Sequence, residues 1–173
     1  MKRVVLAIVV MGLFALATPA SALPVGFDLF GVNDPALRAH VVFEYTPGTG
    51  TIDIAITNTS LPAAGPDPRF TSFAFNVPAG ITGFSGFTGP AGWSGLFDSD
   101  DIATPGQFGF YDLAGITGPN FSGGSPNAGI PRTSTFDFEF ILTGVGLGGL
   151  SESSFLSLLS FDAPGPPDEK EQF

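Results

Sequence analysis

Three aspartates within four residues form the densest group of chemically capable side chains in the sequence, in Phe97-Asp98-Ser99-Asp100-Asp101-Ile102. Carboxylates this close repel one another unless a cation or water lies between them, and calcium takes about six to eight oxygen ligands. The spacing lacks the third acid, the glycine and the distal glutamate of an EF-hand. Asp98, Asp100 and Asp101 are therefore candidate calcium ligands, with Asp112 or Asn127 as a distant ligand. The alternative is a solvated turn whose aspartates bond their own backbone.

The chain has one tryptophan, Trp93, within Gly92-Trp93-Ser94-Gly95. Small neighbours leave a large ring accessible, as a sugar-stacking platform requires, so Trp93 is the candidate residue for carbohydrate binding. Large aromatic rings also bury readily, and the alternative is a core tryptophan at a tight bend.

Candidate groups for catalysis are few. The sequence has one histidine, His40, and no cysteine, and it has no Gly-x-Ser-x-Gly nucleophile motif. A secreted hydrolase with two carboxylates remains an alternative, although sequence alone does not fix the separation of the acids. Its candidates are Asp98, Asp100, Asp101, Asp112, Asp137 and Glu139. We expect no enzymatic activity and no catalytic residue, with His40 exposed on a strand.

Residues 1–22 have the three-part layout of a cleaved secretory signal peptide. Lys2 and Arg3 supply positive charge, residues 4–17 are apolar except for Gly12, and Ala20-Ser21-Ala22 is an Ala-x-Ala cleavage site. The apolar run is shorter than the roughly 20 residues that span a bilayer as a helix. We therefore expect an exported protein, extracellular or at the bacterial cell surface, whose mature chain has no membrane span.

The mature chain is strongly acidic. It retains four basic residues against sixteen acidic ones, a formal net charge of −12. This charge repels the phosphate backbone, so we expect no nucleic-acid partner. Without cysteine, neither a disulfide scaffold nor a thiolate metal site can form. Stability must come from an apolar core, to which 19 phenylalanines can contribute.

Glycine and proline divide the chain into short runs in which apolar and polar residues alternate. The clearest hairpin joins 38–45 to 51–59 through Pro47-Gly48-Thr49-Gly50. Further strands are expected near 27–31, 73–77, 108–110 and 136–142, with one or two irregular strands between 84 and 97. The pattern predicts an all-β protein with a single antiparallel, jelly-roll-like β-sandwich over residues 23–163.

Helical spacing occurs once, in residues 151–160, where Phe155, Leu158 and Leu159 share a face and Ser151 is a plausible N-cap. We expect one short helix there, with a strand from Phe155 onward as the alternative. Residues 164–173 are rich in proline and charge and predict a loop or tail, or the truncated end of a longer domain.

Three segments resemble exported bacterial proteins of the PEP-CTERM, exosortase-sorted type: residues 108–112, 123–130 and 154–160. The resemblance covers roughly residues 69–173. The C-terminal Pro-Glu-Pro motif, apolar span and basic cluster of such proteins are absent from this sequence. The resemblance implies a surface or extracellular-matrix component of a Gram-negative cell.

The leading prediction is therefore a non-enzymatic exported surface or matrix protein, with calcium as a candidate stabilising ion. A secreted carbohydrate-binding module centred on Trp93 is the alternative, and a hydrolase comes third. Expected partners are extracellular polysaccharide or matrix components, and phenylalanine-rich strand edges would favour self-association.

Overall fold

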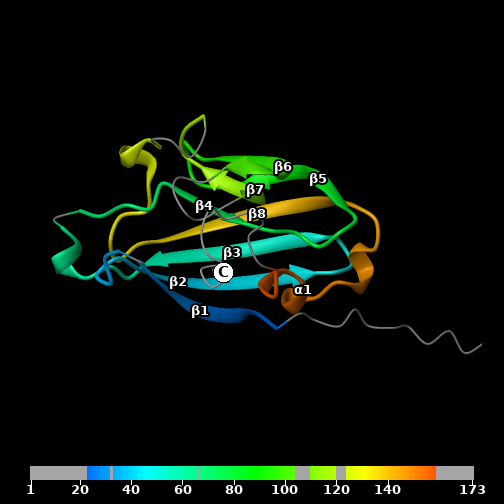
Figure 1. Ribbon diagram of the computed structural model, residues 1–173, viewed down its shortest axis with the longest axis horizontal. Helices are drawn as coiled ribbons and strands as arrows, with labels where there is room; N and C mark the ends of the chain where they lie inside the picture. The colour runs from blue at the N-terminus through cyan, green and yellow to red at the C-terminus, as the bar shows by residue number, and fades with distance from the viewer. Residues whose placement is uncertain (1–22, 32, 66, 104–109, 120–123, 159–173) are drawn as a thin grey trace, which may run out of the picture.

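The computed structural model describes residues 23–31, 33–65, 67–103, 110–119 and 124–158. They form two antiparallel sheets packed as a sandwich, with one short helix (Figure 1). The predicted all-β sandwich is confirmed. Residues 1–22 and 164–173 lie outside the described residues, so the predictions of a signal peptide and a tail remain predictions.

The larger sheet has five strands in the order β1-β2-β3-β8-β5. Their bounds are β1 Val25–Phe30, β2 Arg38–Thr46, β3 Thr51–Asn58, β8 Thr135–Gly144 and β5 Ile81–Thr88. The smaller sheet has the order β4-β7-β6, with β4 Ser72–Phe75, β7 Phe110–Ile116 and β6 Ser94–Ala103. Among the described residues, short 3₁₀ turns lie at Pro62–Ala64, Pro126–Ala128 and Leu147–Gly149.

The β2–β3 hairpin forms where the alternation predicts it. Phe43 pairs with Ile54 and Tyr45 with Ile52, and all four are buried. The turn closes through Gly50, whose amide donates to the Thr46 carbonyl at 2.9 Å. Gly50 has φ +67°, a conformation that glycine adopts without the steric cost of a side chain.

Phenylalanine rings fill the space between the sheets. Phe140 on β8 is fully buried, and rings from β4 and β5 surround it, including Phe75 at 6.3 Å and Phe87 at 4.9 Å between centroids. Edge-to-face and tilted aromatic pairs add about 0.5–1.5 kcal/mol each beyond the area they bury. Ring packing of this kind contributes to the stability of a chain that has no cysteine.

Two predicted elements differ in extent from the structure. The irregular stretch 84–97 contains the end of β5 and the start of β6, with residues 89–93 between the two strands. The helix expected over 151–160 is α1, Glu152–Leu156, and residues 159 and 160 lie outside the described part. Ser151 is its N-cap residue, and the Ser151 amide donates to Ser154 Oγ at 3.1 Å.

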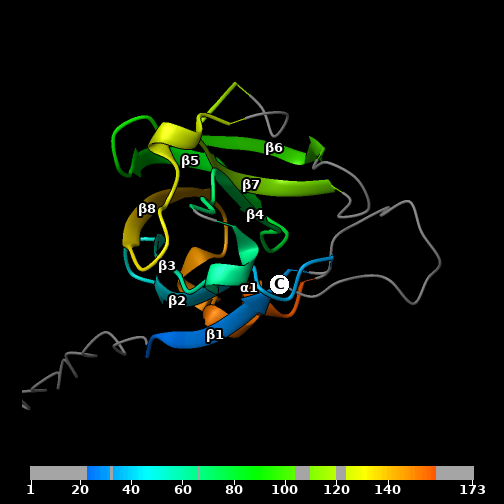
Figure 2. The ribbon, with the colours of Figure 1, turned by 90° about the vertical axis from the view of Figure 1, so that its left-hand side faces the viewer.

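The five-stranded sheet curls, so that β5 comes next to β6 at one side of the sandwich, while β1 and β4 are the edge strands at the other (Figure 2). α1 packs against β2, where Phe155 contacts Phe43 and Tyr45 at centroid distances of 5.5 and 5.0 Å. Within the described ranges, no helix is both long and apolar enough to cross a bilayer.

Candidate functional site

Trp93, the candidate for carbohydrate binding, lies in the core. It is 9% exposed, and its ring centroid lies 4.7 Å from that of Phe138 and 5.9 Å from that of Phe73. The indole N–H donates to the Ala128 carbonyl at 2.8 Å. A sugar platform needs a ring face open to solvent, so this burial favours the alternative interpretation of a core tryptophan.

The acidic cluster forms an irregularity within β6. Phe97 pairs with Leu113 and Ile102 with Tyr111, so four residues of β6, 98–101, lie opposite Asp112 alone. Such an insertion in one strand is a β-bulge, which locally interrupts the ladder. The register thus brings the two parts of the predicted calcium site, the acidic run and Asp112, to one level of the sheet.

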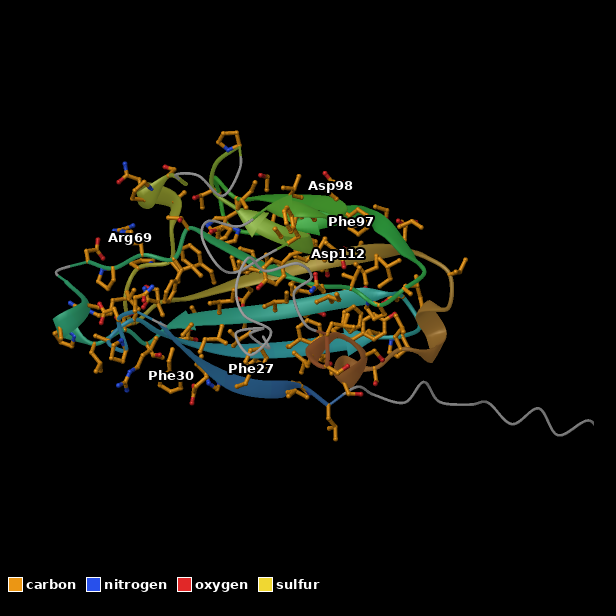
Figure 3. All side chains as sticks on the ribbon, in the orientation of Figure 1. Phe27, Phe30, Arg69, Phe97, Asp98 and Asp112 are labelled. Carbon is orange, nitrogen blue, oxygen red and sulfur yellow. The ribbon has the colours of Figure 1, made fainter. Side chains whose placement is uncertain are left out.

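The side chains of this bulge are described only in part. Asp98 is exposed, and it is labelled with Phe97 on β6 in Figure 3. The side chains of Asp100 and Asp101 lie outside the described residues. Among the residues that the structure describes, no group of three acidic or histidine side chains has a metal-binding arrangement. Calcium at this bulge therefore stays a prediction.

Asp112 has a structural role. It is 6% exposed, and its Oδ2 accepts a hydrogen bond from the Val77 amide at 2.9 Å. Val77 follows the end of β4, whose last residue, Phe75, pairs with Leu113 of β7. Asp112 thereby holds the chain where β4 ends, a contact that needs no metal.

His40, the only histidine of the chain, lies on the outer face of the larger sheet. Its Nδ1 is 2.8 Å from Asp28 Oδ1 on β1, and both side chains are substantially exposed. The two residues are directly opposite each other in the β1–β2 register. This is an exposed cross-strand pair, consistent with the prediction for His40.

A partly open cavity of about 260 Å³ lies between the sheets and is here called the inter-sheet cavity. Its walls are mostly apolar and include both edge strands, β1 and β4, together with α1. The wall residues Phe27, Leu29, Phe73 and Phe75 are only half-buried, whereas Phe138 and Phe140 deeper in the sandwich are 2% and 0% exposed. Sequence reasoning did not find this cavity, because it arises from the unequal widths of the two sheets.

A second feature missed from the sequence is a row of three carboxylates across the outer face of the larger sheet. Asp53 on β3 lies opposite Glu44 on β2 and Glu139 on β8. Partial desolvation, followed by the charges of Glu139 and Glu44, raises the pKa of Asp53 above its usual value, although the residue is exposed. Strand registers reveal such rows, which a linear sequence does not show.

Asn58 was also missed as a structural residue. It is fully buried, and its Nδ2 donates to the carbonyls of Pro68 and Ile130 at 2.8 and 2.9 Å. Its Oδ1 accepts from the Ser60 amide at 3.1 Å. The side chain thus fixes the segments that lead into β4 and β8. In the sequence, the only indication of this structural role is an asparagine at the end of an alternating strand.

Comparison with known proteins found no matching family model, no similar curated protein and no similar solved structure. The resemblance to PEP-CTERM proteins therefore remains a prediction from the sequence.

Proposed function

We propose that this protein is an exported, non-enzymatic component of the cell surface or extracellular matrix. The observation that carries the proposal is the use of its reactive side chains to hold the fold. Asp112 binds the Val77 amide, Trp93 binds the Ala128 carbonyl inside the core, and His40 pairs with Asp28. The recess between the sheets is lined by apolar side chains, which suit packing better than acid–base chemistry.

Two further features support the proposal. The signal-peptide layout of residues 1–22 provides for export. The net charge of −12 on the mature chain keeps an aromatic-rich protein soluble outside the cell. The resemblance of residues 108–112, 123–130 and 154–160 to PEP-CTERM proteins extends the proposal to a Gram-negative surface.

Export is tested by expressing the full chain in a Gram-negative host and fractionating the culture. We expect a mature chain that begins at Leu23, identified by mass spectrometry, in the periplasmic, surface or extracellular fractions. The matched control reverses the charge of the first segment, as Lys2→Glu with Arg3→Glu, and retains the uncleaved chain inside the cell.

An intact N-terminus in the cytoplasm of cells carrying the unaltered chain would contradict export.

The non-enzymatic part of the proposal is tested with the purified mature chain on a panel of glycans and esters. Turnover that disappears on substitution of one exposed acid, such as Asp98→Asn, would overturn it in favour of the hydrolase.

A further inference from the structure

The two sheets of the sandwich have unequal widths, five strands against three, and this leaves part of the larger sheet uncovered. β4 is the edge strand of the smaller sheet, and its ring Phe75 contacts Phe43 of β2 at a centroid distance of 6.0 Å. A strand placed beyond β4 would face β2 and β1. The inter-sheet cavity lies at this position, with Phe27 and Leu29 of β1 on its wall.

Backbone groups on the outer edge of β4 face away from β7, toward the side where a further strand would lie. On the β7 side, the Thr71 carbonyl accepts a hydrogen bond from the Thr117 amide. On the other side, the backbone amide and carbonyl of Phe70 both bond to the backbone of Ile130. Residues of an antiparallel strand direct their N–H and C=O groups to alternate sides. Ser72 and Ala74 therefore direct theirs away from β7. An apolar cavity beside such an edge is the arrangement that β-strand addition uses.

The chain itself leads a suitable segment to this place. Phe155 and Leu156 of α1 line the cavity, and residue 159 follows only three residues after Leu156. The sequence Leu159-Ser160-Phe161-Asp162-Ala163 alternates apolar and polar residues and is followed by Pro164. Five residues span about 16 Å as a strand, enough to pair with the four residues of β4. Proline, which has no N–H, is suited to end the pairing.

We propose that residues 159–163 bind in the inter-sheet cavity as an added strand on the edge of β4, with Leu159, Phe161 and Ala163 facing β1 and β2. The segment starts at the α1 end of the cavity, the end to which β4 runs, so the added strand is antiparallel to β4. Its attachment to α1 gives it a high local concentration at the cavity, which favours the same copy over a second copy. The proposal is independent of the proposed function.

The test compares two substitutions on opposite faces of the segment in the otherwise complete mature chain. Phe161→Asp places a charge in the cavity, whereas the matched control Ser160→Asp places the same group on the outer face. We expect Phe161→Asp to make amide hydrogen exchange at Ser72 and Ala74 at least about tenfold faster. We also expect it to increase the fluorescence of an anilinonaphthalene sulfonate probe, with Ser160→Asp changing neither signal.

Truncation provides a second pair of variants. A chain that ends at Leu158 should behave like Phe161→Asp, and one that ends at Pro164 should behave like the unaltered chain. Equal exchange in all variants would overturn the proposal. Protection of Ser72 and Ala74 that depends on protein concentration, with a dimer in sedimentation, would overturn it in favour of strand exchange with a second copy.

Discussion

The two sheets differ in how their strands are buried. On β2 and β3, buried residues alternate with more exposed ones along almost the whole strand. On β7, every residue from Tyr111 to Ile116 is buried. Leu113 belongs to the main core, while the next residue, Ala114, belongs to a second apolar cluster with Ile102, Tyr111 and Ile116. Successive strand residues point to opposite faces, so β7 is buried on both.

This difference shows where sequence periodicity carries information. A strand with one face in the core and one in solvent needs a period of two, and the larger sheet has it. A strand buried on both faces has no such need, and Phe110-Tyr-Asp-Leu-Ala-Gly-Ile116 shows no alternation. The smaller sheet is buried on both faces at β7, although it contains only three strands.

The difference in burial between the two sheets can be tested by placing a leucine on the outer face of each sheet. Ala114→Leu adds volume at a fully buried position, and Ala55→Leu adds it at a half-buried position on β3. We expect Ala114→Leu to lower the free energy of unfolding by about 1–3 kcal/mol through overpacking. The change for Ala55→Leu should stay within about 0.5 kcal/mol. Urea denaturation measures both changes. Equal losses of unfolding free energy would mean that the outer face of β7 is no more tightly packed than the outer face of β3.

The sequence predicted the larger sheet better than the smaller one. Residues 38–45 and 51–59 gave the β2–β3 hairpin in nearly its observed bounds, because alternation and a Pro-Gly turn point to the same structure. Of the strand expected at 108–110, only Phe110 lies within the described residues. It begins β7, which continues to Ile116 without a periodic signal. The inter-sheet cavity and the Glu44–Asp53–Glu139 row depend on which strands are neighbours, and local patterns carry no such information.

The sequence drew attention to particular residues, but it did not show whether each one binds a ligand or holds the fold. Trp93 and Asp112 are both prominent residues, but their observed contacts hold the fold. An isolated aromatic or acidic residue in a glycine-rich stretch has the same sequence appearance on a surface as in a core. Burial decides between these roles, and it follows from tertiary packing.

Asp112 gives the next test, because it separates a structural contact from a metal site in the smaller sheet. Asp112→Ala removes the acceptor of the part-buried Val77 amide, and we expect a loss of about 1.5 kcal/mol in unfolding free energy, with or without calcium. Asp98→Ala removes an exposed carboxylate and should change stability only when calcium is bound. Thermal melts with calcium and with a chelator measure both.

A chelator that lowers the melting temperature of the unaltered chain, but not that of Asp98→Ala or Asp100→Ala, would establish the calcium site. Identical melts under both conditions would leave the bulge of residues 98–101 as a solvated irregularity of β6, stabilised through its neighbour β7. The acidic bulge would then resemble the outer face of the larger sheet, where Asp53 lies opposite Glu44 and Glu139.

The smallest expected effect concerns that outer face. Because desolvation and the charges of Glu139 and Glu44 raise the pKa of Asp53, the folded state binds its proton more tightly than the unfolded state does. The ionised carboxylate therefore disfavours folding at pH values above its folded pKa. This penalty disappears as the pH falls below the usual value of 3.8.

Asp53→Asn should accordingly raise the free energy of unfolding at pH 7 by about 0.2–1 kcal/mol, the range for cross-strand pairs. The gain should vanish below pH 3.8, and salt should reduce it, because exposed charges are screened over about 8 Å at physiological ionic strength. Asp137→Asn is the matched control, since Asp137 lies opposite Ala55 in the register. Urea denaturation at both pH values measures the change. A gain for Asp53→Asn that persists at low pH would show that the change does not arise from charge repulsion, and the carboxylate row would then have no electrostatic cost to the larger sheet.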